Sequence, residues 1–211
     1  MLNSTRLTFV RHGETAWNVD HRLQGHLDIP LNDTGRAQAQ LTAAALGDEA
    51  FDALYSSDLG RALDTAAPLA ERLALPVTPD PALRERHFGA LQGLRPADAE
   101  HEHPELWQRY RGRALDWVPP GGESLADFAA RIHTRLETLA SQHHGQSLLL
   151  VTHGGVLEVI YRLATSTPLA LPRDFPIPNA AIYRIERHPG GWRLLGWAER
   201  PHLEQARDEI L

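Results

Sequence analysis

Two apolar runs that each end in a histidine and a glycine constrain the fold of this chain more than any other feature. Residues 7–10 lead into an Arg-His-Gly sequence that contains His12, and residues 147–152 lead into a His-Gly-Gly sequence that contains His153. Short aliphatic runs of this kind favour buried strands, and the second is apolar enough to be covered on both faces. Because ligands bind at the carboxyl ends of strands in an open α/β sheet, both histidines are expected to face a cleft.

Predicted helices and further strands surround these two runs. Residues 29–47 predict a helix, capped by Asn32 or Asp33, whose apolar face includes Ala37, Leu41, Ala44 and Ala45. Residues 51–56 predict a strand, followed by a helix that Ser57 or Asp58 can cap. Ser124 is the natural N-cap of a further helix, in which apolar residues recur at helical spacing: Leu125, Phe128, Ile132, Leu136 and Leu139. Residues 181–185 and 192–197 predict an antiparallel hairpin. Because strands and helices alternate along the preceding sequence, the chain is expected to form an α/β fold.

Composition narrows the classes of function. The 211 residues form one predicted domain with a formal charge of -6, which argues against a general affinity for nucleic acid or anionic lipid. The absence of cysteine excludes disulfides and thiolate catalysis. No apolar stretch approaches the length of a membrane span, and the N-terminus lacks a signal-peptide pattern, so the default expectation is a cytoplasmic protein.

The 12 histidines invite a metal hypothesis, which their spacing does not support. His101 and His103 would point apart on a helix, and no third ligand lies at a conventional spacing. We therefore predict no metal site.

Four groups that are or can become cations are expected at the carboxyl ends of strands: Arg11, His12, Arg61 and His153. Arg61 falls in the first turn of its helix, where stability alone would favour an acid, so its charge suits an anion. Each group has an ordinary structural explanation when taken alone, as does Glu85, which could form a surface ion pair. Together they describe a phosphoryl pocket in which arginines bind oxygens, imidazoles bracket the phosphorus and Glu85 supplies a proton.

Two nearby segments supply further candidate contacts. Residues 16–25 are expected to form a loop with at most one helical turn over the Arg-His end. Asn18, Arg22 and Gln24 are candidate ligand contacts there, although polar loop residues are usually only solvated. Residues 96–117 mix aromatic and basic side chains. This mixture predicts either a lid that selects the substrate or two short surface helices packed by their aromatic residues.

These motifs resemble those of the histidine phosphatase superfamily, the phosphoglycerate mutase-like proteins. Residues 11–15 with Trp17-Asn18 resemble the family signature, and residues 56–62 match its second arginine motif. Residues 83–85 with Phe88-Gly89 match the acid-bearing loop, and residues 152–155 match the second histidine motif. The resemblance implies a three-layer α/β/α fold with a mostly parallel central sheet and an antiparallel C-terminal edge. It places one domain over residues 1–211, with a candidate lid or specificity insertion at about residues 94–122.

The resemblance also implies a double displacement through a phosphohistidine. His12 would attack the phosphorus, and Glu85 would protonate the leaving oxygen and then accept a proton from water. The phosphoryl charge would be stabilised by Arg11, Arg61 and His153. The other candidate phosphate contacts are Asn18, Gln24, Gly25 and Gly154. No metal or other cofactor is required.

Three activities remain open from the sequence. Residues 85–94 resemble the mutase version of the acid loop, whereas residues 23–25 resemble a phosphatase loop, and the chain after Gly93 is too short for the segment that closes over bisphosphoglycerate in true mutases. We favour a phosphatase that acts on a small phosphate ester. The alternatives are a cofactor-dependent phosphoglycerate mutase, which would use bisphosphoglycerate, and a non-catalytic module that binds phosphate or a phosphoprotein.

The natural substrate and the oligomeric state are not predicted by these motifs. The candidate specificity residues are Trp107, Arg109, Tyr110, Arg111 and Arg113, which could hold a carboxylate, a sugar or a second phosphate. A homodimer is a candidate assembly, formed through an antiparallel edge at Tyr183 or an exposed Trp192.

Overall fold

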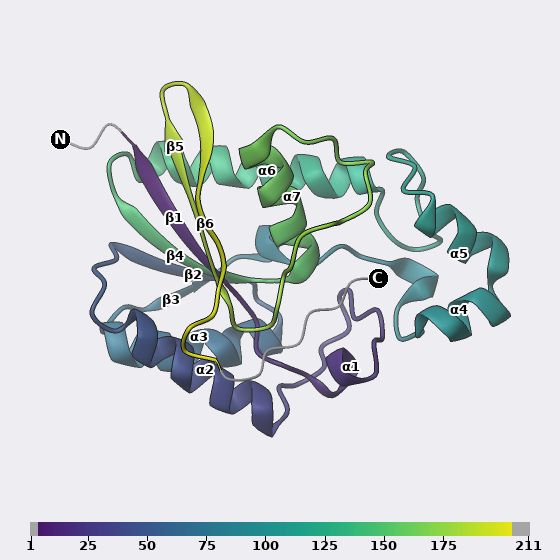
Figure 1. Cartoon of the computed structure of the whole chain (residues 1–211), viewed down its shortest axis with the longest axis horizontal. Coiled ribbons are helices and arrows are strands. Elements are labelled where there is room, and N and C mark those ends of the chain that lie inside the picture. The colour runs from purple at the N-terminus through teal and green to yellow at the C-terminus, as the bar shows by residue number, and fades with distance from the viewer. Residues whose placement is uncertain (1–3, 204–211) are drawn as a thin grey trace.

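A computed structural model describes residues 4–203 of the protein, in which six strands form one sheet between two layers of helices (Figure 1). The strands are β1 (Thr5–Arg11), β2 (Ala53–Ser56), β3 (Val77–Pro79), β4 (Ser147–Thr152), β5 (Ile182–His188) and β6 (Gly191–Glu199). The α-helices are α1 (Ala16–Val19), α2 (Asp33–Leu46), α3 (Gly60–Leu73), α4 (Pro96–Glu102), α5 (Pro104–Arg111), α6 (Leu125–Gln142) and α7 (Gly154–Thr165). Two 3-10 turns, η1 (Pro81–Leu83) and η2 (Gly89–Leu91), lie in the loop after β3.

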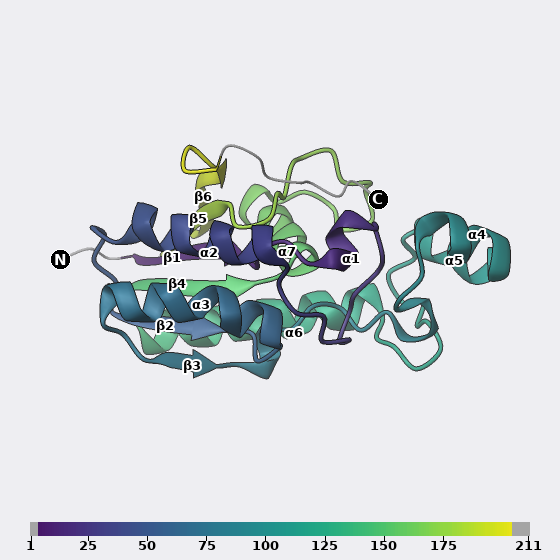
Figure 2. The same cartoon turned by 90° about the horizontal axis from the view of Figure 1, so that it is seen from below.

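The strand order is β3-β2-β4-β1-β5-β6, and the first four strands are parallel. β5 and β6 add an antiparallel edge, as predicted. Figure 2 shows the parallel strands pointing toward the end of the sheet where α1, α4 and α5 lie. The functional groups predicted at strand ends therefore meet at this end of the molecule.

Each face of the sheet buries its own apolar cluster. Along β4, Leu148 and Leu150 pack with α6 and α7, whereas Leu149 and Val151 pack with α2 and α3. This alternation follows from the period of two along a strand that is covered on both sides. Fold class, layers and the mixed sheet are thus confirmed.

The helix that Ser124 begins is also confirmed. The Ser124 hydroxyl accepts from the Asp127 N–H at 2.9 Å, and the five apolar residues predicted on one face of α6 are all buried.

The predicted apolar face of α2 is wrong. All four of its residues are exposed (Ala37, Leu41, Ala44 and Ala45), and the helix buries a different set, which is Gly35, Gln38, Ala39, Thr42, Ala43 and Leu46. Hydrogen bonds make this polar face tolerable, since Gln38 Oε1 accepts from the Glu14 N–H at 2.9 Å and Thr42 Oγ1 lies 3.0 Å from the Ala180 carbonyl oxygen. A search for apolar periodicity cannot find a buried face of this composition.

The predicted cap of α3 is also wrong. Leu59 is the N-cap residue and supplies no side-chain hydrogen bond. Instead Asp28, from the loop before α2, accepts from the Gly60 N–H at 3.0 Å. The cap is therefore tertiary, and neither Ser57 nor Asp58 fills the role that the local sequence suggested.

The α4–α5 segment forms two short helices with a small apolar core of their own, which matches the second of the two structures predicted for residues 96–117. Trp107 is buried with Leu23, Leu91 and Ala99. This cluster ties the segment to the loops beside the strand ends (Figure 1).

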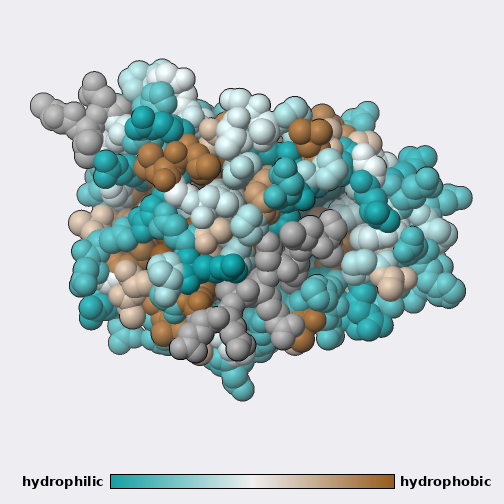
Figure 3. Space-filling model, viewed as in Figure 1, coloured by the Kyte–Doolittle hydropathy of each residue, from teal (hydrophilic) through white to brown (hydrophobic). Residues whose placement is uncertain are grey.

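The surfaces predicted for a homodimer are not available as expected. Tyr183 is fully buried, because β5 pairs with β1 on one side and β6 on the other. Trp192 is half-buried, and its indole N–H donates to Glu137 Oε1 at 2.7 Å. The face in Figure 3 is largely hydrophilic, with apolar side chains in separate patches. The homodimer stays a prediction. Among the described residues, no helix is long and apolar enough to cross a bilayer.

Candidate active site

β1 and β4 bring the two predicted histidines side by side. The strands are parallel neighbours in which Arg11 lies opposite Thr152, and each histidine is the next residue of its chain segment. The His12 N–H donates to the Thr152 carbonyl at 2.9 Å, and the centroids of the His12 and His153 rings are 5.2 Å apart. Both side chains are almost completely buried. Strand register alone therefore assembles this pair.

The His12 ring is held in one tautomer. Its Nδ1 lies 2.8 Å from the Gly13 carbonyl oxygen, so Nδ1 carries the proton and donates, and the lone pair is on Nε2. Burial, together with the charges of Arg61 and Arg11, holds the pKa of His12 well below its ordinary value of 6.5. His12 is therefore neutral near neutral pH, as a nucleophile must be.

His153 is oriented by Ser57. Its Nε2 lies 2.7 Å from Ser57 Oγ, and that hydroxyl accepts from the Leu59 N–H at 3.4 Å. The hydroxyl proton then points at Nε2, and we assign the ring proton of neutral His153 to Nδ1. Nδ1 is buried and has no hydrogen-bond partner among residues 4–203. Burial first, and then the charge of Arg61, holds the pKa of His153 well below 6.5.

The two arginines carry charge and also hold loops. Arg61 is fully buried, and its Nη1 and Nη2 donate to the carbonyls of Leu27 and Gly25 at 2.8 and 2.7 Å. Its Nε is buried with no hydrogen-bond partner among the described residues. Burial lowers the pKa of Arg61 to about 10, which leaves it charged at neutral pH. Arg11 Nη1 donates to the Ile177 carbonyl at 2.5 Å.

Glu85 is a buried carboxyl that accepts two backbone hydrogen bonds. Oε1 accepts from the Arg86 N–H at 2.7 Å, and Oε2 accepts from the Gly155 N–H at 2.8 Å. These bonds and the charges of Arg61 and Arg11 favour the carboxylate, but burial outweighs them and raises the pKa of Glu85 above its ordinary value. The predicted surface ion pair of Glu85 does not form among the described residues, and the side chain lies in the same charged cluster as His12.

The other candidate phosphate contacts lie at this cluster with different local roles. Asn18 is fully buried and completes the capping box of α1, in which its Oδ1 accepts from the N–H of the N-cap residue Thr15 at 2.9 Å. Gln24 is buried, and its Oε1 has no partner in the described part of the chain. Gly25 contributes the carbonyl that holds Arg61. A Cβ on Gly154 would lie 3.6 Å from Arg11 Cζ, which is an ordinary contact.

Three residues at the site were missed from the sequence. Asn179 is fully buried, and its Nδ2 donates to the His12 carbonyl at 3.0 Å. His26 lies with Nε2 2.8 Å from the Glu85 carbonyl oxygen. Ser57, expected only as a cap, orients His153. Each acts through a contact between segments far apart in the chain, so no local spacing pattern signals it.

The candidate specificity residues separate into different environments. Arg109 and Arg111 are exposed on α5. Trp107 packs inside the α4–α5 core and stacks on Tyr110, with ring centroids 5.3 Å apart. Burial raises the pKa of Tyr110 to about 12. Arg113 forms an ion pair with Glu158 of α7 at 2.5 Å, which ties the end of the segment to the main domain.

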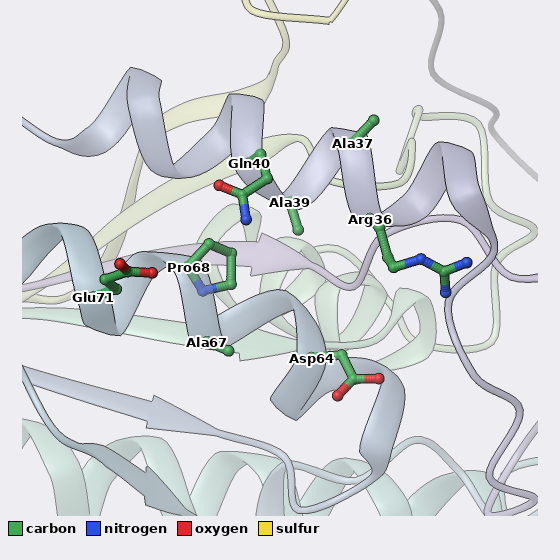
Figure 4. A pocket seen from close by; sticks show the side chains of 8 residues that line it. All are labelled: Arg36, Ala37, Ala39, Gln40, Asp64, Ala67, Pro68 and Glu71. Atoms are coloured by element: carbon green, nitrogen blue, oxygen red, sulfur yellow. The ribbon is translucent and has the colours of Figure 1, made fainter.

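Two other features of the described residues bear on the site. Residues 4–203 hold no group of three or more acidic, histidine or cysteine side chains that could hold a metal ion. A cavity of about 600 Å³ lies between α2 and α3, lined by Arg36, Ala37, Ala39, Gln40, Asp64, Ala67, Pro68 and Glu71 (Figure 4). None of the predicted site residues lines that cavity, so the cavity adds no contact to the candidate site at the strand ends.

The chain is similar to several known proteins over most of its length. The family described as the histidine phosphatase superfamily (branch 1) matches residues 7–200. Phosphoglycerate mutase-like protein 4 of Arabidopsis thaliana is 38% identical over 203 residues, which cover 94% of this chain and 87% of the relative. A metal-independent phosphoserine phosphatase of the same plant is 38% identical over 202 residues, covering 94% and 83%. The structure of mycobacterial glucosyl-3-phosphoglycerate phosphatase has a TM-score of 0.79 at 34% identity, covering 93% of this chain and 99% of that one.

Proposed function

The chain belongs to branch 1 of the histidine phosphatase superfamily and is a phosphomonoester hydrolase, and we propose that it works through a covalent phosphohistidine at His12. The observation that carries this proposal is the opposite perturbation of two groups in one buried cluster. His12 is kept neutral with its lone pair on Nε2, while burial raises the pKa of Glu85 and so favours its protonated form relative to an exposed carboxyl. A neutral nucleophile beside a protonated acid is the arrangement that phosphoryl transfer from an ester needs.

The first half-reaction transfers the phosphoryl group to the enzyme. His12 Nε2 donates its lone pair to phosphorus, the bond from phosphorus to the ester oxygen breaks, and the proton of Glu85 goes to that oxygen, so the alcohol leaves neutral. Arg11, Arg61 and the Nδ1–H of His153 stabilise the charge on the remaining oxygens.

The second half-reaction returns the enzyme to its starting state. The Glu85 carboxylate takes a proton from water as the water oxygen bonds to phosphorus. The bond from phosphorus to His12 Nε2 breaks, and its electron pair returns to the ring. Inorganic phosphate leaves, and no metal or cofactor takes part in this scheme. One relative is a metal-independent phosphoserine phosphatase, which supports a scheme without a metal.

For the substrate we propose a small phosphorylated acid. Phosphoserine and glucosyl-3-phosphoglycerate, named for two of the similar proteins, both carry a carboxylate near the phosphate. Arg86 follows Glu85 and is 6% exposed; it has no ion-pair partner among the described residues, and its Nε donates to the Glu123 carbonyl at 3.1 Å. Such a cation beside the acid suits a substrate carboxylate. Substrates of this kind are intracellular metabolites, so we infer a cytoplasmic site of action.

The test compares the wild type with His12→Ala, using His101→Ala on exposed α4 as the control. Each protein is incubated with p-nitrophenyl phosphate and, separately, with 3-phosphoglycerate plus bisphosphoglycerate. We expect phosphate release from the wild type and His101→Ala and none above background from His12→Ala. An acid-labile phosphoryl label should remain on the wild type and on His101→Ala, but not on His12→Ala.

Other outcomes point elsewhere. Efficient isomerisation of phosphoglycerate without phosphate release would favour the mutase. Full turnover by His12→Ala would refute the covalent intermediate.

A further inference from the structure

The loop that carries Glu85 has little regular structure of its own. Residues 84–88 form neither helix nor strand, so their position depends on hydrogen bonds to other elements. The bond from the Gly155 N–H to Glu85 Oε2 spans from this loop to α7. It forms only if the loop backbone lies at the right distance from that helix. Whatever holds the loop therefore also fixes the acid.

Arg131 of α6 donates to two carbonyls of this loop and to one carbonyl of the preceding turn, η1. Its Nη1 lies 2.9 Å from the Ala82 oxygen and 3.0 Å from the Arg84 oxygen, and its Nη2 lies 3.3 Å from the Glu85 oxygen. The planar guanidinium places donors at several fixed positions, which a lysine ammonium at the end of a flexible stem does not reproduce.

Glu123 fixes Arg131 and the far end of the loop together. Its Oε1 accepts from Arg131 Nη2 at 2.7 Å and from the His87 N–H at 2.9 Å. The Glu123 N–H in turn donates to the His87 carbonyl at 3.0 Å. The loop is thus held from the α6 side on both sides of Glu85.

We propose that Arg131 is a positioning residue for the general acid, an inference that rests on the role proposed above for Glu85. Among the described residues, Arg131 forms no hydrogen bond or ion pair with the Glu85 carboxyl group or with the other side chains of the phosphoryl site. It acts by holding the backbone from which the carboxyl projects. A displaced acid can no longer protonate the leaving oxygen well. Esters with a poor leaving group should then lose reactivity, whereas p-nitrophenyl phosphate, whose leaving group needs little protonation, should lose less.

The test measures kcat/KM for phenyl phosphate and for p-nitrophenyl phosphate. Arg131→Lys should lower the value for phenyl phosphate by about 10- to 100-fold and the value for p-nitrophenyl phosphate by less than about threefold. The larger loss is a part of the roughly 10²- to 10⁴-fold that a general acid contributes. Arg135→Lys is the matched control, because Arg135 lies one turn further on α6, has 23% of its side chain exposed against 25% for Arg131, and pairs with Asp80. We expect no such difference between substrates in the control.

Glu85→Gln, measured in parallel, separates the two levels of the proposal. If Glu85→Gln discriminates between the substrates and Arg131→Lys does not, the positioning role of Arg131 is refuted while the acid stands. If Glu85→Gln does not discriminate, the acid role itself fails. The same discrimination in Arg135→Lys would also overturn the proposal. Should Arg131→Lys fail to fold, Glu123→Gln replaces it as the test, because this change removes the charge that holds the Arg131 guanidinium. Glu123→Gln should lower kcat/KM more for phenyl phosphate than for p-nitrophenyl phosphate. Equal losses on the two substrates would refute the positioning role of Arg131.

Discussion

Adding one methyl group at Gly155 should disable the acid without removing any catalytic side chain. A Cβ at this position would lie 2.2 Å from Glu85 Oε1 and 3.1 Å from its Cδ, so the carboxyl must move by roughly 1 Å to reach an ordinary contact distance. The Gly155 N–H bond to Oε2 would be lost in the same movement. A misplacement of this size costs on the order of 100-fold in rate, so we expect Gly155→Ala to lower kcat/KM for phenyl phosphate by about that factor.

Gly154→Ala is the matched control for this experiment. It adds the same methyl group one residue earlier in the first turn of α7, where the nearest atom is Arg11 Cζ at 3.6 Å. We expect this variant to stay within about threefold of the wild type, since alanine is well tolerated in a helix. Steady-state kinetics and thermal unfolding should be measured on both variants. Equal activity of the two variants, with both folded, would refute the assignment of Glu85 as a tightly placed acid.

Three further predictions follow from the buried polar groups and the α4–α5 core. Burial lowers the pKa values of His12 and His153, so both side chains are neutral in the folded protein and gain a proton on unfolding below pH 6.5. The free energy of unfolding should therefore fall as the pH falls below that value, and thermal melts of the His12→Gln/His153→Gln double variant should show a weaker fall. Ser57→Ala should lower kcat by about tenfold or more, because it removes the hydroxyl that orients His153. Ser56→Ala, which removes a hydroxyl that donates only to a backbone carbonyl, should lower kcat less in an assay with the same substrate. Trp107→Ala should destabilise the α4–α5 core by up to about 3–5 kcal/mol and make this segment more sensitive to limited proteolysis, and it should change kcat/KM by the same factor for all substrates. A change confined to one substrate would show that Trp107 is a specificity residue.

The sequence predicts elements well where apolar residues carry the pattern. In α6 the apolar positions recur at helical spacing against polar neighbours, and every predicted core residue is buried. In α2 the buried face includes Gln38 and Thr42, which are satisfied by Glu14 and by a carbonyl from the far end of the chain. Because those partners are distant in sequence, local hydrophobicity points to the alanine-rich face, which is exposed. The prediction for α2 fails because tertiary hydrogen bonds, and not local hydrophobicity, decide which face of this helix is buried.

The site follows the same rule. The sequence places the histidines and arginines at strand ends and helix starts, because those positions depend on strand and helix boundaries that patterns reveal. It cannot identify the side chains that hold these histidines and the acid loop in position through contacts from other segments. Asn179, His26 and Arg131 each bind a backbone carbonyl on another segment, and nothing in their local sequence distinguishes them from solvated residues.

Arg61 shows how such contacts bear on function. The sequence suggested that its fork binds phosphoryl oxygens, but both terminal nitrogens donate to the carbonyls of the loop at residues 25–27, and no carboxylate pairs with it at contact distance among the described residues. Burying a cation that has no carboxylate at contact distance is unfavourable, yet the pKa of Arg61 of about 10 keeps it charged. A phosphoryl group bound at this end of the sheet would bring negative charge to contact distance of Arg61, so part of the cost of burying this cation would return as binding energy. This accounts for a fully buried arginine in the first turn of α3, where stability alone would favour an acid.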